Sequence, residues 1–144
     1  MRDRVFGDGE GHERYLGYYT AAFSAGGYPH RDEPVYVSYA QPGRQLARYA
    51  LRDGRSAFFF VFAQDAPLEI DHHDVDAQCR VLRDRLAGAG WEADAILDVM
   101  DDATDLYFDA VAQTRMPEWS RGRTVLVGDA AYCPSLLAGQ GCGR

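Results

Sequence analysis

The sequence contains no lysine and no asparagine, so all 15 of its basic residues are arginines. Without lysine, the chain has neither a P-loop lysine nor a lysine that could form a Schiff base. Because the codons of Lys and Asn are AT-rich, both absences indicate a GC-rich bacterial genome. No apolar run is long enough to span a membrane, and the polar N-terminal segment is not typical of a signal peptide.

Cysteine is scarce as well, and the three cysteines (Cys79, Cys133 and Cys142) are odd in number and lack the spacing of a zinc site. The simplest interpretation is reduced thiols in a cytoplasmic protein. The adjacent pair His72-His73, with Cys79, is the best candidate for a metal site. Neighbouring rings diverge, however, so we expect no metal there.

The charge and composition exclude further classes of protein. A net charge of -7 argues against binding to nucleic acid or to an anionic membrane, because both need a basic surface. With 47% hydrophobic and 26% charged residues, the 144-residue chain predicts a folded domain with a real core rather than disorder.

Apolar alternation and turn signals predict five strands. The most informative is Ser56–Ala63, where Phe58, Phe60 and Phe62 fall on one face and Phe59 and Val61 on the other. Since both faces are apolar, we expect this strand to be central and covered on both sides. Asp53-Gly54 before it is typical of a two-residue hairpin turn. The other strands are expected at Arg14–Ala25, Val35–Gln41, Gln45–Arg52 and Asp105–Arg115.

Between the fourth and fifth strands the apolar period changes to that of a helix. The spacing predicts a helix near Asp74–Ala87, with Asp74 as its N-cap and Gly88 or Gly90 as its stop. Residues Trp91, Ala95, Ile96 and Val99 predict a second, shorter helix. The predicted fold class is α+β, a mostly antiparallel sheet with helices on one face.

The segment from Gly122 to Gly141 holds the candidate site. Its β-branched run Thr124–Val127 predicts a buried strand that ends in the turn Gly128-Asp129. A carboxylate in such a turn suits a ligand with hydroxyls, and glycine amides suit a flat or anionic group. Two simpler interpretations remain open. Asp129 could cap the turn, and the glycines beyond Pro134 could supply positive φ angles in a loop.

This segment resembles the Gly-Asp motif of FAD-dependent monooxygenases, the aromatic hydroxylases similar to p-hydroxybenzoate hydroxylase. The resemblance rests on Arg115, Trp119, Gly122-Arg123, Gly128–Ala131, Pro134 and Gly139–Gly141, in that order. It implies that Asp129 binds the ribityl chain of FAD and that the glycines approach the flavin ring. The cofactor-binding residues it implies are Gly128, Asp129, Ala130, Pro134, Gly139, Gln140 and Gly141, and no side chain is assigned a catalytic role.

The resemblance also implies an activity, the NAD(P)H-dependent hydroxylation of a small aromatic or polyketide-like substrate. One face of the predicted sheet would form a wall of the substrate cavity. The aromatic residues of Ser56–Ala63 are also explained simply as core, and a few could serve both purposes. We expect residues 1–123 to form a substrate-binding-like α+β domain and residues 124–144 a partial FAD-binding segment.

The sequence departs from the family pattern in one major respect. It contains no GxGxxG turn, so we expect the N-terminal Rossmann part that holds the FAD pyrophosphate to be absent from this chain. We therefore expect this chain to be a portion of a flavoprotein that binds FAD weakly or not at all, with Thr124–Val127 making few contacts. The alternative is a non-catalytic α+β module that binds an apolar ligand or self-associates through its sheet as a homo-oligomer.

Overall fold

The computed structural model describes residues 2–7, 12–29 and 35–138. The chain divides into two compact units. The central unit is the continuous stretch Tyr18–Ala110, and the terminal unit combines Met1–Gly17 with Val111–Arg144. Two strands, β1 (Glu13–Gly26) and β5 (Tyr107–Arg115), each contribute to both units.

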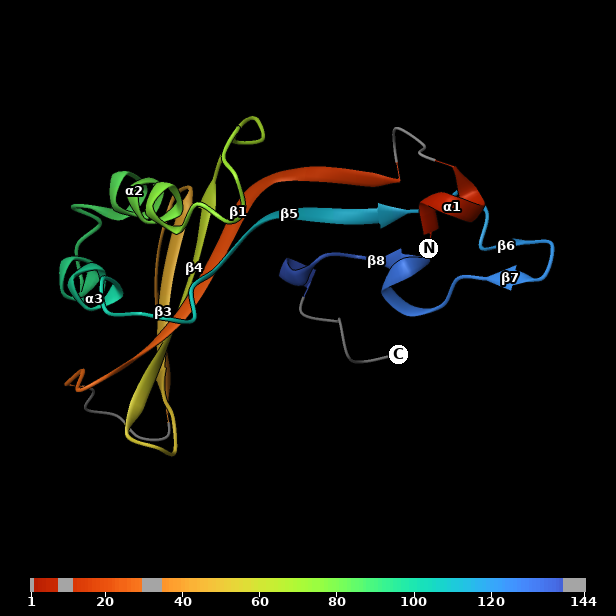
Figure 1. Ribbon diagram of the computed structural model, residues 1–144. Helices are drawn as coiled ribbons and strands as arrows, with labels where there is room; N and C mark the ends of the chain where they lie inside the picture. Colours follow the sequence, from red (N-terminus) through yellow and green to blue (C-terminus); the bar gives the residue numbers. More distant parts are fainter. Residues whose placement is uncertain (1, 8–11, 30–34, 139–144) are drawn as a thin grey trace. The chain divides into compact units, whose positions relative to one another are not determined.

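The main sheet has six strands in the order β2-β3-β4-β1-β5-β8 (Figure 1). Strands β2 (Tyr36–Gln41), β3 (Arg44–Ala50) and β4 (Arg55–Ala63) form consecutive hairpins, and β4 pairs antiparallel with β1. All five predicted strands are confirmed, and Ser56–Ala63 is an interior strand as expected. The β3–β4 turn is longer than the predicted two residues, because β3 ends at Ala50 and Leu51–Gly54 form the loop.

The two faces of β4 are buried to different extents. Phe58, Phe60 and Phe62 are at most 1% exposed on the face that the helices cover. On the opposite face, called the open face below, Ala57 and Phe59 are half-buried. The expectation of cover on both sides is therefore wrong for the first half of this strand. Both helices pack on the same side, as Figure 1 shows for the central unit.

Helix α2 (Val75–Leu86) begins and ends where the sequence predicts. The carboxylate of Asp74 accepts a hydrogen bond from the Ala77 amide at 2.9 Å, and Gly88 follows the helix with φ of 64°. Helix α2 lies against the sheet in Figure 1, and its residues Leu82 and Leu86 are fully buried.

The second helix, α3 (Ala93–Met100), is displaced from the predicted apolar positions. It buries Ala93, Ile96, Leu97 and Met100, whereas Ala95 is exposed. Trp91 lies before the helix with a positive φ of 52° and stacks on Tyr39 at 6.0 Å between ring centroids. The spacing of Trp91 fits a helix, but the residue lies outside α3 and stacks on a strand residue.

The terminal unit consists of short elements. They are helix α1 (Arg2–Phe6), the hairpin of β6 (Ser120–Arg121) with β7 (Thr124–Val125), the single-turn helices η1 (Gly128–Ala130) and η2 (Leu136–Ala138), and β8 (Tyr132–Cys133). Strand β8 pairs with β5 through Thr114–Cys133 and Arg115–Tyr132. Across the described ranges, no helix is long and apolar enough to cross a membrane.

The prediction of a buried strand at Thr124–Val127 is wrong. Only Thr124–Val125 is strand, and its partner is the two-residue strand β6 rather than a larger sheet. Val125 is 63% exposed and Val127 is 74% exposed. β-branched residues favour extended backbone, but burial needs neighbouring strands on both sides. The expectation that this segment makes few contacts agrees with these exposures.

Candidate functional site

The Gly-Asp turn lies at the surface of the terminal unit. Gly128 has φ of 58°, and a Cβ added to it would meet no atom within 4 Å. Asp129 and Ala130 are exposed, and η1 is closed by a hydrogen bond from the Ala131 amide to the Gly128 carbonyl at 3.0 Å. Within the part of the chain that the structure describes, no hydrogen bond or ion pair engages the Asp129 carboxylate. The carboxylate and the bare glycine backbone are therefore both accessible to a ligand.

The chain beyond this turn is held by β8 and by local hydrogen bonds. Pro134 follows β8 directly, and its carbonyl accepts a hydrogen bond from the Gln113 side chain at 3.5 Å. Ser135 is buried with φ of 122°, and its hydroxyl accepts from the Leu137 amide at 3.1 Å. The predicted residues Gly128, Asp129, Ala130 and Pro134 thus share one short segment. Gly139, Gln140 and Gly141 lie outside the described residues.

A second candidate site is a hollow in the open face of the central unit. Strand register places Tyr36, Tyr49, Ala57 and Ser24 in one row across β2, β3, β4 and β1. Because Ala57 is small, the row is low in its middle and bounded by tyrosine rings, and the hollow has a volume of about 410 Å³. The residues that line it are Ala22, Phe23, Ser24, Tyr36, Tyr49, Leu51, Arg55, Ala57, Phe58, Phe59, Asp105 and Tyr107.

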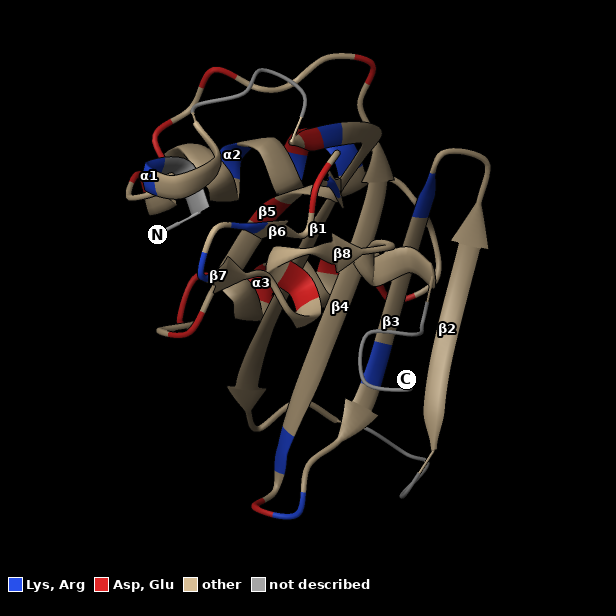
Figure 2. Cartoon of the chain, turned by 90° about the vertical axis from the view of Figure 1, so that its right-hand side faces the viewer, with Lys and Arg blue, Asp and Glu red and all other residues tan. Residues whose placement is uncertain are grey.

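Half of the residues that line this hollow are aromatic, and most are uncharged. Tyr36, Tyr49 and Tyr107 are 55%, 42% and 50% exposed, so their rings are accessible to a ligand. The rings of Tyr36 and Tyr49 lie 6.5 Å apart at an angle of 34°. In Figure 2, β2 carries no charged residue, and β4 carries only Arg55 at its first position. Such a surface suits a planar apolar ligand.

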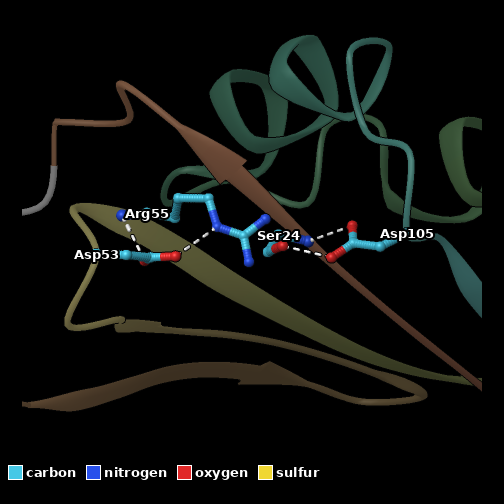
Figure 3. Close-up of polar contacts among 4 residues, drawn as sticks. All are labelled: Ser24, Asp53, Arg55 and Asp105. Atoms are coloured by element: carbon cyan, nitrogen blue, oxygen red, sulfur yellow. Dashed lines mark hydrogen bonds and ion pairs between the residues drawn. The ribbon is translucent and has the colours of Figure 1, made fainter.

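Polar groups gather at one end of the hollow. Asp105 accepts hydrogen bonds from both the amide (3.0 Å) and the hydroxyl of Ser24. Arg55 pairs with Asp53 through Nε and Oδ2 at 3.0 Å, and Asp53 also accepts the Arg55 amide at 3.2 Å. Figure 3 shows the guanidinium of Arg55 pointing from Asp53 toward Ser24. This arrangement leaves a polar edge beside an aromatic surface.

These contacts shift the titration of the groups involved. The two hydrogen bonds from Ser24 lower the pKa of Asp105, and the positive charge of Arg55 adds to this effect. The pKa of Asp53 is lowered mainly by the hydrogen bond from the Arg55 amide. Burial, together with the nearby Asp109, raises the pKa of Tyr107. At neutral pH the two carboxylates are therefore ionised and the Tyr107 hydroxyl is neutral.

The other candidates from the sequence are not assembled into a site. The rings of His72 and His73 do not diverge as expected but contact each other edge to face, with 5.4 Å between the ring centroids. Among the described residues, no three His, Cys, Asp or Glu side chains are grouped to hold a metal ion. Cys79 is half-buried, and burial raises its pKa, which disfavours the reactive thiolate.

The sequence analysis did not find the hollow, although it singled out the strands that form it. The contributing residues come from five strands or strand ends that are far apart in the chain. One signal was available. Tyr36, Tyr49 and Phe59 lie on the face of the sheet opposite to Phe58, and this alternation predicts a second aromatic surface.

Comparisons with known proteins show which proteins this chain resembles. No family model matches the chain. A flavin-dependent monooxygenase from an unidentified prokaryote is 37% identical over 142 residues, which are 97% of this chain and 36% of that protein. The uncharacterized protein Rv1260 of Mycobacterium tuberculosis is also 37% identical, over 98% of this chain. The chain belongs to the flavin-dependent monooxygenase family.

Solved structures share the fold of this chain. The tetracycline destructase Tet(55) superimposes with a TM-score of 0.79 and 32% identity, over 90% of this chain and 34% of that protein. HpxO of Klebsiella pneumoniae, solved with FAD and uric acid, shares the fold with a TM-score of 0.70 and 23% identity. This member of the family spans about a third of the length of the curated relatives that it matches.

Proposed function

We propose that this chain contributes the substrate-binding sheet and the Gly-Asp flavin segment of an FAD-dependent monooxygenase. Residues 1–123 then act as the substrate-binding part and residues 124–144 as the partial FAD-binding segment. The observation that carries the proposal is the accessible carboxylate of Asp129, next to a glycine whose backbone is unobstructed, in a chain related to flavin-dependent monooxygenases.

The described residues of this segment fit a flavin. Asp129 can accept hydrogen bonds from the ribityl hydroxyls, and Gly128 allows close approach of the backbone because it has no side chain. Pro134 follows β8 directly, and Gly139, Gln140 and Gly141 come after it in the sequence. When bound, FAD would supply the reducible ring that reacts with oxygen, while the protein supplies position and polarity.

The open-face hollow is the proposed place for the substrate. A volume of about 410 Å³ lies within the range of roughly 300–1,000 Å³ that small-molecule pockets occupy. Tyr36, Tyr49 and Phe59 offer rings on which a planar substrate can stack. The reaction we propose is hydroxylation of an aromatic or polyketide-like compound at the expense of NAD(P)H.

The 144-residue chain itself is expected to bind flavin weakly. Its sequence has no GxGxxG turn to hold the pyrophosphate, so most of the dinucleotide affinity is missing. Ordering loop residues costs about 1–2 kcal/mol each, and single hydrogen bonds return roughly 0.5–1.5 kcal/mol. The chain alone should therefore consume no NAD(P)H when FAD is added.

The test compares riboflavin with FAD in titrations followed by flavin fluorescence. Because only the ribityl and ring contacts are present, both ligands should bind with similar dissociation constants, above about 100 μM. Asp129→Ala should weaken both by about tenfold, since it removes charge-assisted hydrogen bonds. The control is Asp84→Asn, an exposed carboxylate on α2. Equal binding by Asp129→Ala and the unmodified chain, or micromolar binding of FAD, would contradict the proposal.

A second candidate function is supported by the hollow alone. A non-catalytic module could bind an apolar ligand on the open face, or self-associate through it, without any flavin. A colourless chain that forms a stable dimer, with riboflavin binding unaffected by Asp129→Ala, would favour this alternative. A chain that binds riboflavin weakly and through Asp129 favours the flavin function.

A further inference from the structure

The charged groups at the hollow restrict which aromatic molecules it can accept. Among the residues that the structure describes, two charged side chains line it, Arg55 and Asp105. Arg55 is already paired with Asp53 at 3.0 Å, so its positive charge is largely compensated. Two carboxylates and one guanidinium at this end sum to a formal charge of -1. We infer that the hollow selects planar aromatic ligands that are neutral or positively charged and rejects those that carry a carboxylate.

The geometry at Asp105 gives the reason for rejecting anions. Its two oxygens each accept a hydrogen bond from Ser24, which fixes the carboxylate at the edge of the lining. Carboxylate oxygens have further lone pairs, so they can accept a hydrogen bond from a ligand hydroxyl, amide or ammonium group. A ligand carboxylate offers no such donor at neutral pH, and it would lie near a like charge.

Arg55 does not reverse this preference. A ligand carboxylate could reach the guanidinium only in competition with Asp53. The Asp53 carboxylate accepts hydrogen bonds from both the guanidinium and the backbone amide of Arg55. The aromatic rings act in the same direction as Asp105. The faces of Tyr36 and Tyr49 attract a cation through their quadrupoles, whereas an anion gains nothing from them.

The inference rests on the proposed function for the site and specifies its substrate class. The test uses three probes of the same size: 2-naphthoate, 2-naphthamide and 2-naphthylmethylammonium. Their affinities for the 144-residue chain are measured by calorimetry at pH 7 and low salt. The amide and the ammonium probe should bind at least about tenfold more tightly than the carboxylate, as expected for one charge contact near a protein surface.

Variants assign the preference to named groups. Asp105→Asn should bring the ammonium and carboxylate affinities to within about threefold of each other, because it removes the uncompensated charge. Arg55→Gln should widen their ratio. Ser24→Ala keeps the charge of Asp105 and should leave the order of the probes unchanged, and so should the control Asp84→Asn. Ala57→Leu fills the floor of the hollow and should abolish binding of all three probes.

The outcomes separate this inference from the flavin assignment. Equal or tighter binding of 2-naphthoate, an unchanged ratio in Asp105→Asn, or no binding of any probe would overturn the inference. None of these results affects the riboflavin titrations of Asp129, which does not line the hollow. If Asp129→Ala leaves riboflavin binding unchanged while the order of the probes holds, the flavin function fails and the ligand preference stands.

Discussion

The ion pair between Arg48 on β3 and Glu92 before α3 should be a main determinant of stability in the central unit. Arg48 is only 4% exposed, and it donates to Glu92 from Nε at 2.7 Å and from a terminal nitrogen at 3.1 Å. Tyr28 donates to the same carboxylate at 2.7 Å, and the guanidinium lies 5.8 Å from the ring of Trp91. Replacing Glu92 with Gln leaves a buried guanidinium without this counter-charge.

The expected cost can be worked from these contacts. Breaking a buried ion pair typically costs about 3–5 kcal/mol, but the Glu92 side chain is 31% exposed, so water screens part of the loss. We expect Glu92→Gln to lower the free energy of unfolding by roughly 2–3 kcal/mol. For a chain of this size that corresponds to a fall in Tm of roughly 6–9 °C. Urea denaturation followed by circular dichroism measures the change directly.

Two further variants make the measurement decisive. Asp53→Asn breaks the pair with Arg55, in which the two side chains are 57% and 47% exposed, and should lower the stability far less than Glu92→Gln does. Adding Arg48→Met to Glu92→Gln should recover part of the loss, because the buried positive charge that contacted Glu92 is then gone. The reasoning is refuted if Glu92→Gln costs no more than Asp53→Asn, or if the double variant is the least stable of the set.

Three smaller effects should be measurable in the same denaturation assay. Burial, followed by the hydrogen bond to Glu92, raises the pKa of Tyr28 above its ordinary 10.0, so its stabilising effect is complete below pH 10 and is lost as pH rises further. Tyr28→Phe should flatten this alkaline decline. Ser24 lowers the pKa of Asp105 below 3.8, so the contribution of Asp105 to stability is present above pH 3.8 and disappears as pH falls. The stability of Ser24→Ala should therefore depend less on pH in the acid range. Asp74→Ala should cost about 1 kcal/mol through loss of the N-cap, with a steeper loss indicating a role beyond capping.

Local patterns in the sequence predicted the strands well because alternation and turn signals lie within each strand and its flanking residues, and β2, β3 and β4 are joined by hairpins. The alternation through Phe58, Phe60 and Phe62 specified both a strand and its buried face. The same pattern could not say what covers Phe59, because cover depends on elements elsewhere in the chain. The prediction of two-sided burial failed there for that reason.

The candidate sites show the same limit. The Gly128-Asp129 turn was predictable since its residues are consecutive, and its positive φ is what a glycine at that position allows. The prediction that Thr124–Val127 is buried was wrong because β-branched residues favour extended backbone but do not indicate how many strands lie beside it. Predicting the hollow would have required the register of β1 to β4. That register brings Ser24 and Tyr36 into one row, whereas the alternation within each strand does not align them.

The division of the chain has a consequence for how such a protein can change over time. The central unit is one uninterrupted stretch, Tyr18–Ala110, inserted between the two parts of the terminal unit. Every residue that lines the hollow belongs to this insertion, whereas the Gly-Asp turn belongs to the flanking sequence. The two ends of the insertion lie on β1 and β5, which are neighbours in the sheet. Ligand preference can therefore diverge, or be exchanged as a single gene segment, while the flavin motif stays untouched.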